Sequence, residues 1–124
     1  GQVWEALMCA AHFRLGRLTA IIDRNGLQID GAVSDVMEVE PLADKLCAFG
    51  WDVAEVDGHD AAALTEALER PRAAGDRPLA LICHTVKGKG VSFMENQANW
   101  HGAPICDEDY AQAMAELGCK EEVE

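Results

Sequence analysis

The chain has 124 residues, a formal net charge of −12 and an apolar content of 49%. This apolar fraction is typical of a globular chain and argues against an intrinsically disordered one. The acidic balance argues against a nucleic-acid surface, because phosphate backbones are bound by clustered Lys and Arg. No apolar run approaches the roughly 20 residues that span a bilayer. From the charge and the apolar runs together, we expect neither a nucleic acid nor a membrane as partner.

The first third of the chain predicts one helix, one strand and a long connection. Apolar spacing predicts a helix over residues 2–15, which Gly16 ends. The continuous apolar run 18–23 is typical of a buried parallel strand. Residues 24–40 contain two glycines and no clear periodicity, so we expect a loop.

The middle of the chain predicts a second helix and strand and then a third helix. Residues 41–49 fit a short helix with Pro in its first turn, and 52–56 fit a strand. A turn over 57–60 ends at Asp60, which is a good N-cap for a helix carrying the apolar stripe 63–68.

The last part predicts a third strand, a long loop and a final helix. A polar connection over 71–78 precedes the strand 79–86. Residues 87–106 are irregular, and 107–117 fit a helix with Asp107 as cap. Helices and strands thus alternate along the chain, which predicts an α/β fold with a parallel sheet and right-handed crossovers.

Cysteine usage indicates a reducing compartment. The five cysteines are Cys9, Cys47, Cys83, Cys106 and Cys119. Their odd number and the absence of a Cys-x-x-Cys pair argue against a disulfide framework and against a zinc site. We therefore expect buried or incidental thiols in a cytoplasmic protein.

The stretch Asp-Arg-Asn-Gly-Leu-Gln-Ile-Asp-Gly, residues 23–31, directly follows the first predicted strand. Open α/β sheets bind their ligands outside the carboxyl ends of strands. The side-chain oxygen of Asn25 and the main-chain carbonyl of Leu27 are hard donors that suit Mg²⁺ or Ca²⁺, and Asp23 is a nearby carboxylate. An ordinary Asn-Gly turn is the alternative, and the spacing leaves both interpretations open.

A basic glycine loop, Lys87-Gly-Lys-Gly90, follows the third predicted strand. Glycines let main-chain N–H groups approach an anion, and lysine adds positive charge, so the loop resembles a phosphate site. A solvated turn is the alternative, because the sequence lacks the nucleotide P-loop pattern.

Three further titratable residues need an interpretation. His101 lies in a loop that contains Gly and Pro, where it is available to a ligand and able to transfer protons near neutral pH; an ordinary exposed histidine fits equally well. Glu5 lies within an apolar helix, where a solvated side chain is the simpler interpretation. His84 lies in an apolar run, so we expect a core histidine.

Seven segments, taken in chain order, resemble the thiamine-diphosphate-binding, amino-terminal domain of transketolase. They are residues 1–6, 22–31, 40–45, 49–53, 56–60, 84–94 and 100–104. Any one segment alone is a weak signal, whereas seven in order are specific. The resemblance implies a three-layer α/β/α thiamine-diphosphate-binding fold, with residues 1–124 forming the carboxyl-terminal part of that domain.

Transketolases are transferases of the pentose phosphate pathway that move a two-carbon ketol unit between sugar phosphates, with thiamine diphosphate and Mg²⁺ (or Ca²⁺) as cofactors. The resemblance implies that Asn25 and Leu27 bind the metal and that Lys87 approaches the diphosphate. It implies that His101 contacts the diphosphate and the substrate hydroxyl or the transferring proton. Glu5 matches a catalytic glutamate at the dimer interface that links the paired active sites.

The resemblance also implies partners for this chain. The family's Gly-Asp-Gly, whose Asp is another Mg²⁺ ligand, matches positions just before Gly1, and we expect it upstream. The pyrimidine-binding domain is expected from elsewhere in a longer chain or from a partner subunit, as in a split, two-gene transketolase. The resulting assembly is a homodimer or a heterotetramer.

Two alternatives stay open. Deoxyxylulose-phosphate synthase and phosphoketolase share the Asn-containing loop and the cofactor, although residues 28–31 and 100–104 fit transketolase better. A truncated paralogue or non-enzymatic interaction module is the other alternative. Reading the coding sequence upstream of Gly1 separates them, because Gly-Asp-Gly there supports the enzyme and an initiator codon supports the module.

We predict that the chain alone is inactive as a transketolase, because the glutamate that activates the cofactor ring belongs to the pyrimidine-binding domain. The measurement is ketol transfer from a ketose phosphate to an aldose phosphate by the purified chain, supplied with thiamine diphosphate and Mg²⁺. Measurable transfer without an added partner chain would contradict this prediction.

Overall fold

The computed structural model describes residues 1–69 and 77–118, which belong to two compact units. The first unit contains Gly1–Arg24 and Val39–Thr85, and the second contains Asn25–Glu38 and Val86–Glu124. Most of the predicted polar connection 71–78 lies outside the described residues, as do Cys119 and the acidic segment Glu-Glu-Val-Glu at 121–124.

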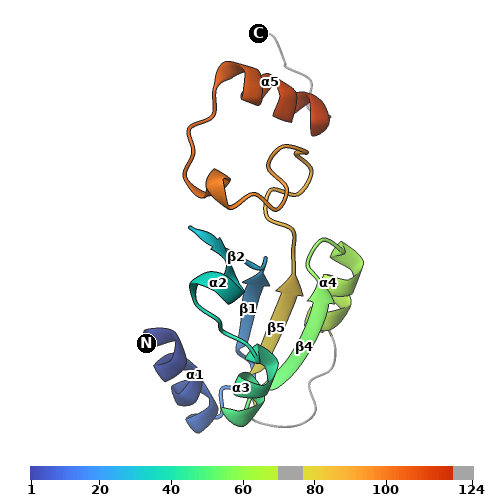
Figure 1. The fold of residues 1–124 in the computed structure, drawn as a ribbon. Helices are drawn as coiled ribbons and strands as arrows, with labels where there is room; N and C mark the ends of the chain where they lie inside the picture. Colours follow the sequence, from blue (N-terminus) through green and yellow to red (C-terminus); the bar gives the residue numbers. More distant parts are fainter. Residues whose placement is uncertain (70–76, 119–124) are drawn as a thin grey trace. The chain divides into compact units, whose positions relative to one another are not determined.

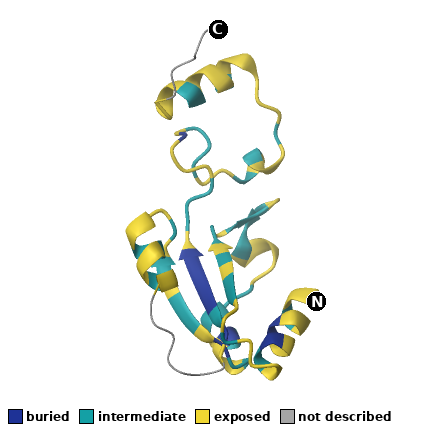
Figure 2. Cartoon of the chain, turned by 180° about the vertical axis from the view of Figure 1, so that it is seen from behind, coloured by how far each residue is buried: buried dark blue, intermediate teal, exposed yellow. Residues whose placement is uncertain are grey.

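A three-stranded parallel sheet forms the centre of the first unit (Figure 1). Its strands are β1 (Thr19–Arg24), β4 (Asp52–Asp57) and β5 (Leu79–His84), in the spatial order β1-β5-β4. Residues 80–83 of the central strand are all buried (Figure 2), as a strand covered on both faces must be. The three strands predicted at 18–23, 52–56 and 79–86 are therefore confirmed, with ends that differ by one or two residues.

Helices cover both faces of this sheet. The first unit contains α1 (Gln2–His12), α3 (Leu42–Ala48) and α4 (Ala61–Glu69). The chain passes from β1 to the far edge strand β4 and then returns to β5, so the two crossovers run in opposite directions. Because parallel crossovers are right-handed, α3 and α4 must lie on opposite faces of the sheet. The predicted three-layer α/β/α arrangement with a parallel sheet is confirmed.

The main hydrophobic core lies between the sheet and the helices α1 and α3. Its members are buried side chains from α1, α3 and β5 together with one tryptophan: Leu7, Ala10, Leu46, Trp51, Ala80 and Ile82. Trp51 is almost fully buried, and its indole Nε1 donates to the Leu7 carbonyl at 2.9 Å. A buried indole needs such a partner, so this bond fixes α1 against the residue that leads into β4.

Two helix caps test the sequence prediction in opposite ways. Asp60 caps α4 as predicted, because its Oδ1 accepts from the amides of Ala62 and Ala63 at 2.9 and 3.0 Å. The predicted cap Asp107 is wrong. Cys106 is the N-cap of α5 (Asp107–Glu116), where its sulfur accepts from the Asp109 amide at 3.4 Å. Cysteine is not among the preferred N-cap residues, so composition favoured the neighbouring Asp.

The second unit contains short elements that periodicity did not reveal. The predicted loop 24–40 holds β2 (Leu27–Gln28), β3 (Gly31–Ala32) and α2 (Val33–Val36). Strands of two residues are too short for an alternation pattern. The irregular stretch 87–106 is confirmed, with one short 3₁₀ helix, η1 (Ala98–His101). No helix in the described part of the chain is long and apolar enough to cross a membrane.

We predict that Leu46→Ala lowers the free energy of unfolding by about 2–5 kcal/mol, because Leu46 is completely buried and alanine leaves a cavity. Urea unfolding followed by tryptophan fluorescence measures the change. Leu68→Ala is the matched control on α4, where the leucine is 44% exposed, and we expect it to cost less than half as much. Equal losses from the two variants would contradict the assignment of the core to the α3 face.

Candidate functional site

The candidate site residues follow the carboxyl ends of two adjacent strands. β1 and β5 pair in parallel with Arg24 opposite His84, so both strands end at the same edge of the sheet. Asn25 follows Arg24 directly, and Lys87 comes three residues after His84. The two connections therefore begin side by side at the edge where open α/β sheets bind ligands.

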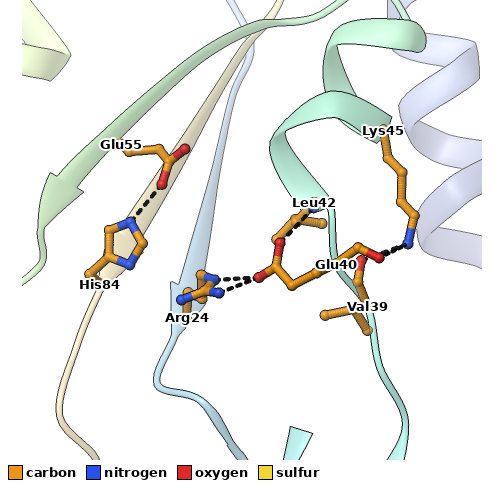
Figure 3. Close-up of polar contacts among 7 residues, drawn as sticks. All are labelled: Arg24, Val39, Glu40, Leu42, Lys45, Glu55 and His84. Carbon is orange, nitrogen blue, oxygen red and sulfur yellow. Dashed lines mark hydrogen bonds and ion pairs between the residues drawn. The ribbon is translucent and has the colours of Figure 1, made fainter. Parts of the chain in front are cut away.

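An ion pair anchors the point where the first connection begins (Figure 3). Arg24, the last residue of β1, donates from Nε to Oε1 of Glu40 at 2.6 Å. The other carboxylate oxygen of Glu40 accepts from the Leu42 amide at 2.8 Å in the first turn of α3. The Leu42 amide and, after it, the Arg24 guanidinium lower the pKa of Glu40, so the carboxylate is charged at neutral pH.

Lys45 secures the same segment from α3. Its Nζ donates to the carbonyl oxygens of Val39 at 2.7 Å and Glu40 at 3.1 Å. Together with the Arg24–Glu40 pair, these bonds fix both chain ends from which residues 25–38 extend.

Residues 25–33 form a hairpin whose register leaves the main-chain N–H and C=O of Leu27 without hydrogen bonds to the opposite strand. Leu27 lies opposite Ala32, and the Val33 amide of the neighbouring pair donates to the Gly26 carbonyl at 3.0 Å. Hydrogen-bonded and non-hydrogen-bonded pairs alternate along an antiparallel ladder. Leu27 and Ala32 are therefore a non-hydrogen-bonded pair, and the Leu27 N–H and C=O both point away from β3.

Asn25 occupies that outward side of the hairpin. Its Oδ1 accepts from the Leu27 amide at 3.0 Å, which makes an Asx turn. An amide oxygen has two lone pairs, so this bond uses only one of them. The Asn25 side-chain oxygen and the Leu27 carbonyl thus lie on the same side of the hairpin and are suitable partial ligands for a hard cation.

Asp23, the carboxylate that the sequence places near Asn25 and Leu27, already has a hydrogen-bond partner just after the neighbouring strand. Asp23 accepts a hydrogen bond from the hydroxyl of Thr85, the residue that follows β5. Among residues 1–69 and 77–118, no group of three or more His, Cys, Asp or Glu side chains is placed to hold a metal ion. Two oxygens are still compatible with Mg²⁺, because this ion usually takes few protein ligands and completes its shell with phosphate oxygens and water.

The glycine loop after β5 is a closed structure over residues 87–96, which we call the Lys87 loop. The Asn96 amide donates to the Lys87 carbonyl at 2.9 Å, and the Gly90 amide donates to Oε1 of Glu95 at 3.0 Å. Gly88 has φ +73°, and a Cβ there would lie 2.6 Å from the Met94 carbonyl oxygen. Only glycine permits this approach, so the loop has a defined conformation.

His101 is carried by the same unit as the Lys87 loop. It is exposed at the end of η1. The preceding residue, Trp100, donates from Nε1 to the Phe93 carbonyl at 3.0 Å, and the two rings meet edge-on with centroids 5.3 Å apart. These contacts connect the His101 segment to the Lys87 loop, while Glu5 is exposed on the first turn of α1 in the other unit.

The expectation of a core histidine at position 84 is wrong. His84 is exposed, and its Nε2 lies 2.7 Å from Oε2 of Glu55 on the neighbouring strand β4 (Figure 3). The buried part of β5 ends at Cys83, so the apolar run extends beyond the covered part of the strand.

The four described cysteines are unpaired. Cys83 is buried, and both desolvation and the charge of Asp23 raise the pKa of its thiol. A raised thiol pKa disfavours the nucleophilic thiolate, so Cys83 is a structural residue.

One side-chain contact in the second unit could not be predicted from any sequence motif. Ser92 of the Lys87 loop donates from its amide and its hydroxyl to the carboxylate of Glu116 in α5. The two residues are 24 positions apart, and no local motif connects them.

A family model described as the thiamine diphosphate binding domain of transketolase matches residues 1–124. The chain is 41% identical over 117 residues to the 6-deoxy-6-sulfo-D-fructose transketolase subunit of Clostridium sp. (strain MSTE9), covering 94% of this chain and 42% of that protein. It is also 41% identical over 117 residues to an apulose-4-phosphate transketolase subunit of Phocaeicola vulgatus, with the same coverage. The chain thus spans about two fifths of the length of these relatives.

The fold agrees with solved structures of the same class. The crystal structure of transketolase from Campylobacter jejuni matches with a TM-score of 0.87 and 28% sequence identity. The match covers 99% of this chain and 19% of that one.

Proposed function

Because the chain belongs to the family of transketolase thiamine-diphosphate-binding domains, we propose that it binds the diphosphate of thiamine diphosphate together with Mg²⁺. The enzyme that contains it transfers a two-carbon ketol unit between sugar phosphates. The observation that carries this proposal is the Asx turn at Asn25, which directs an amide oxygen and the Leu27 carbonyl to one side of the hairpin. Both oxygens are hard donors, as Mg²⁺ requires.

Different residues of the chain bind the metal ion and the diphosphate. Asn25 and Leu27 provide two oxygens for the metal, while the diphosphate and the Asp expected upstream provide further ligands. Lys87 provides positive charge for the diphosphate at the start of a loop with a fixed backbone. When bound, thiamine diphosphate supplies the centre that stabilises a carbanion.

Two residues would act on the substrate side. His101 is exposed and joined through Trp100 to the Lys87 loop, which suits a group that holds or moves a proton at a substrate hydroxyl beside the diphosphate. Glu5 is exposed on α1, as a residue at a subunit interface must be in the separated chain. We assign it to the contact between paired active sites.

We propose a partner subunit or a further domain for the aminopyrimidine half of the cofactor. The two relatives described above at 41% identity are both subunits, which supports a split transketolase assembled as a heterotetramer. If the two domains instead belong to one longer chain, the assembly is a homodimer. Their names specify apulose-4-phosphate and a sulfonated deoxyfructose, so we infer a ketose that carries an anionic group. We place the enzyme in the cytoplasm.

We predict that Asn25→Ala in the complete enzyme weakens Mg²⁺-dependent retention of thiamine diphosphate by about 10-fold or more, because one of few protein oxygens is lost. Isothermal titration with thiamine diphosphate across a Mg²⁺ series measures the effect. Asn25→Asp is the matched control, since a carboxylate oxygen accepts from the Leu27 amide and is also a metal ligand. Unchanged affinity of Asn25→Ala at every Mg²⁺ concentration would refute the metal assignment.

We predict that His101→Ala in the complete enzyme lowers kcat by about 10²–10⁴-fold, the usual contribution of a general acid–base group. The fold is expected to remain intact because His101 is exposed. Steady-state kinetics and a thermal melt test both statements. His12→Ala, which removes a histidine from the end of α1, is the control with unchanged kcat. A loss of less than 10-fold for His101→Ala would remove His101 from the proton-transfer role.

A further inference from the structure

The end of α5 contacts the Lys87 loop through a carboxylate. Glu116, the last residue of this helix, accepts from both the amide and the hydroxyl of Ser92, with Oγ and Oε1 2.7 Å apart. Gln112, one turn earlier, donates from Nε2 to the same Oε1 at 2.8 Å. The bonds from Gln112 and Ser92 lower the pKa of Glu116, so it is an ionised acceptor at neutral pH.

A second contact joins the same two elements. Gly90 has φ +95°, and a Cβ there would lie 3.1 Å from Cδ2 of Leu117, the residue after Glu116. The next residue of the loop, Val91, is buried. The middle of the Lys87 loop therefore lies against the last turn of α5, and the carboxylate contact is not an isolated surface bond.

Carboxylates accept hydrogen bonds from two amide groups near the middle of the loop. Glu95 accepts from the Gly90 amide, and Glu116 accepts from the Ser92 amide. These two amides are therefore already engaged by the protein's own carboxylates, and the charge of Lys89 is shared with Glu95, whose Oε1 lies 3.6 Å from the Lys89 Nζ. An anionic ligand is consequently favoured at the Lys87 end of the loop, which is the end that emerges from β5.

We propose that Glu116 is a positioning residue of the diphosphate site. Acting through Ser92, it holds the Lys87 loop in its binding conformation before the ligand arrives. The inference rests on the proposed function of Lys87. Its physical basis is preorganisation, since a loop that is ordered in advance loses less conformational entropy on binding. Glu116 acts on the ligand only through the loop.

The test compares three variants of the complete enzyme. Glu116→Ala removes both bonds to Ser92, whereas Glu116→Gln keeps an oxygen that accepts one of them. Gln112→Ala is the control, because it removes a neighbour of Glu116 without touching Ser92. Hydrogen exchange of a peptide over 87–96 without cofactor reports the loop, and exchange of a peptide over 79–84 reports the sheet.

We expect faster exchange of the loop peptide in Glu116→Ala, with the sheet peptide unchanged. The affinity for thiamine diphosphate should fall by about 3- to 10-fold, the scale of one or two lost hydrogen bonds to an exposed charged group. At saturating cofactor, kcat should equal that of the unmodified enzyme. Glu116→Gln should recover part of both losses, and Gln112→Ala should resemble the unmodified enzyme in both measurements.

Four results would overturn the inference. Unchanged loop exchange in Glu116→Ala would show that the contact does not order the loop. Faster loop exchange with unchanged cofactor affinity, or faster exchange of the sheet peptide as well, would reduce Glu116 to a structural role. An unmodified enzyme that does not bind thiamine diphosphate would overturn the proposed function, and this inference with it, whereas an Ala variant that binds equally well overturns this inference alone.

Discussion

Parallel pairing of β1 with β5 is the constraint on which the rest of the chain depends. The register sets Arg24 opposite His84, so the connections that carry Asn25 and Lys87 leave the sheet from neighbouring positions. β5 is buried along residues 80–83 and needs helices on both faces, which α3 and α4 provide through crossovers in opposite directions, while α1 packs on the α3 side. The same packing that buries the core therefore fixes the starting points of both loops.

Each loop then obtains its conformation in a different way. The hairpin after β1 is organised locally, by the Asx turn over two residues and by a register that turns the Leu27 carbonyl outward. The loop after β5 depends on glycine at position 88, on bonds within residues 87–96 and on a helix that follows much later in the chain. The first loop suits a fixed pair of metal ligands. The second is held by a contact with Glu116, which is distant in the sequence.

The net charge of −12 opposes the binding of an anionic cofactor by overall repulsion. Several of the acidic residues have structural roles, as acceptors for the chain's own amides. Glu40 accepts from Leu42, Glu95 from Gly90 and Glu116 from Ser92. These carboxylates stabilise loops and the start of α3, and two of them are also paired with cations, Glu40 with Arg24 and Glu95 with Lys89. Local positive charge at Lys87 is compatible with this acidic background, since the balance around a site differs from the total.

The sequence by itself determined the alternation of helices and strands, the parallel sheet, the Asp60 cap and the family, because periodicity, capping and ordered motifs are local properties. Only the tertiary structure decided the strand order, the exposure of His84, the hairpin in residues 25–33 and the contact between Ser92 and Glu116. Strand order and burial depend on which distant segments pack together, and two-residue strands are too short to leave a pattern. The Glu116 contact spans 24 positions, and only folding brings its two residues within bonding distance.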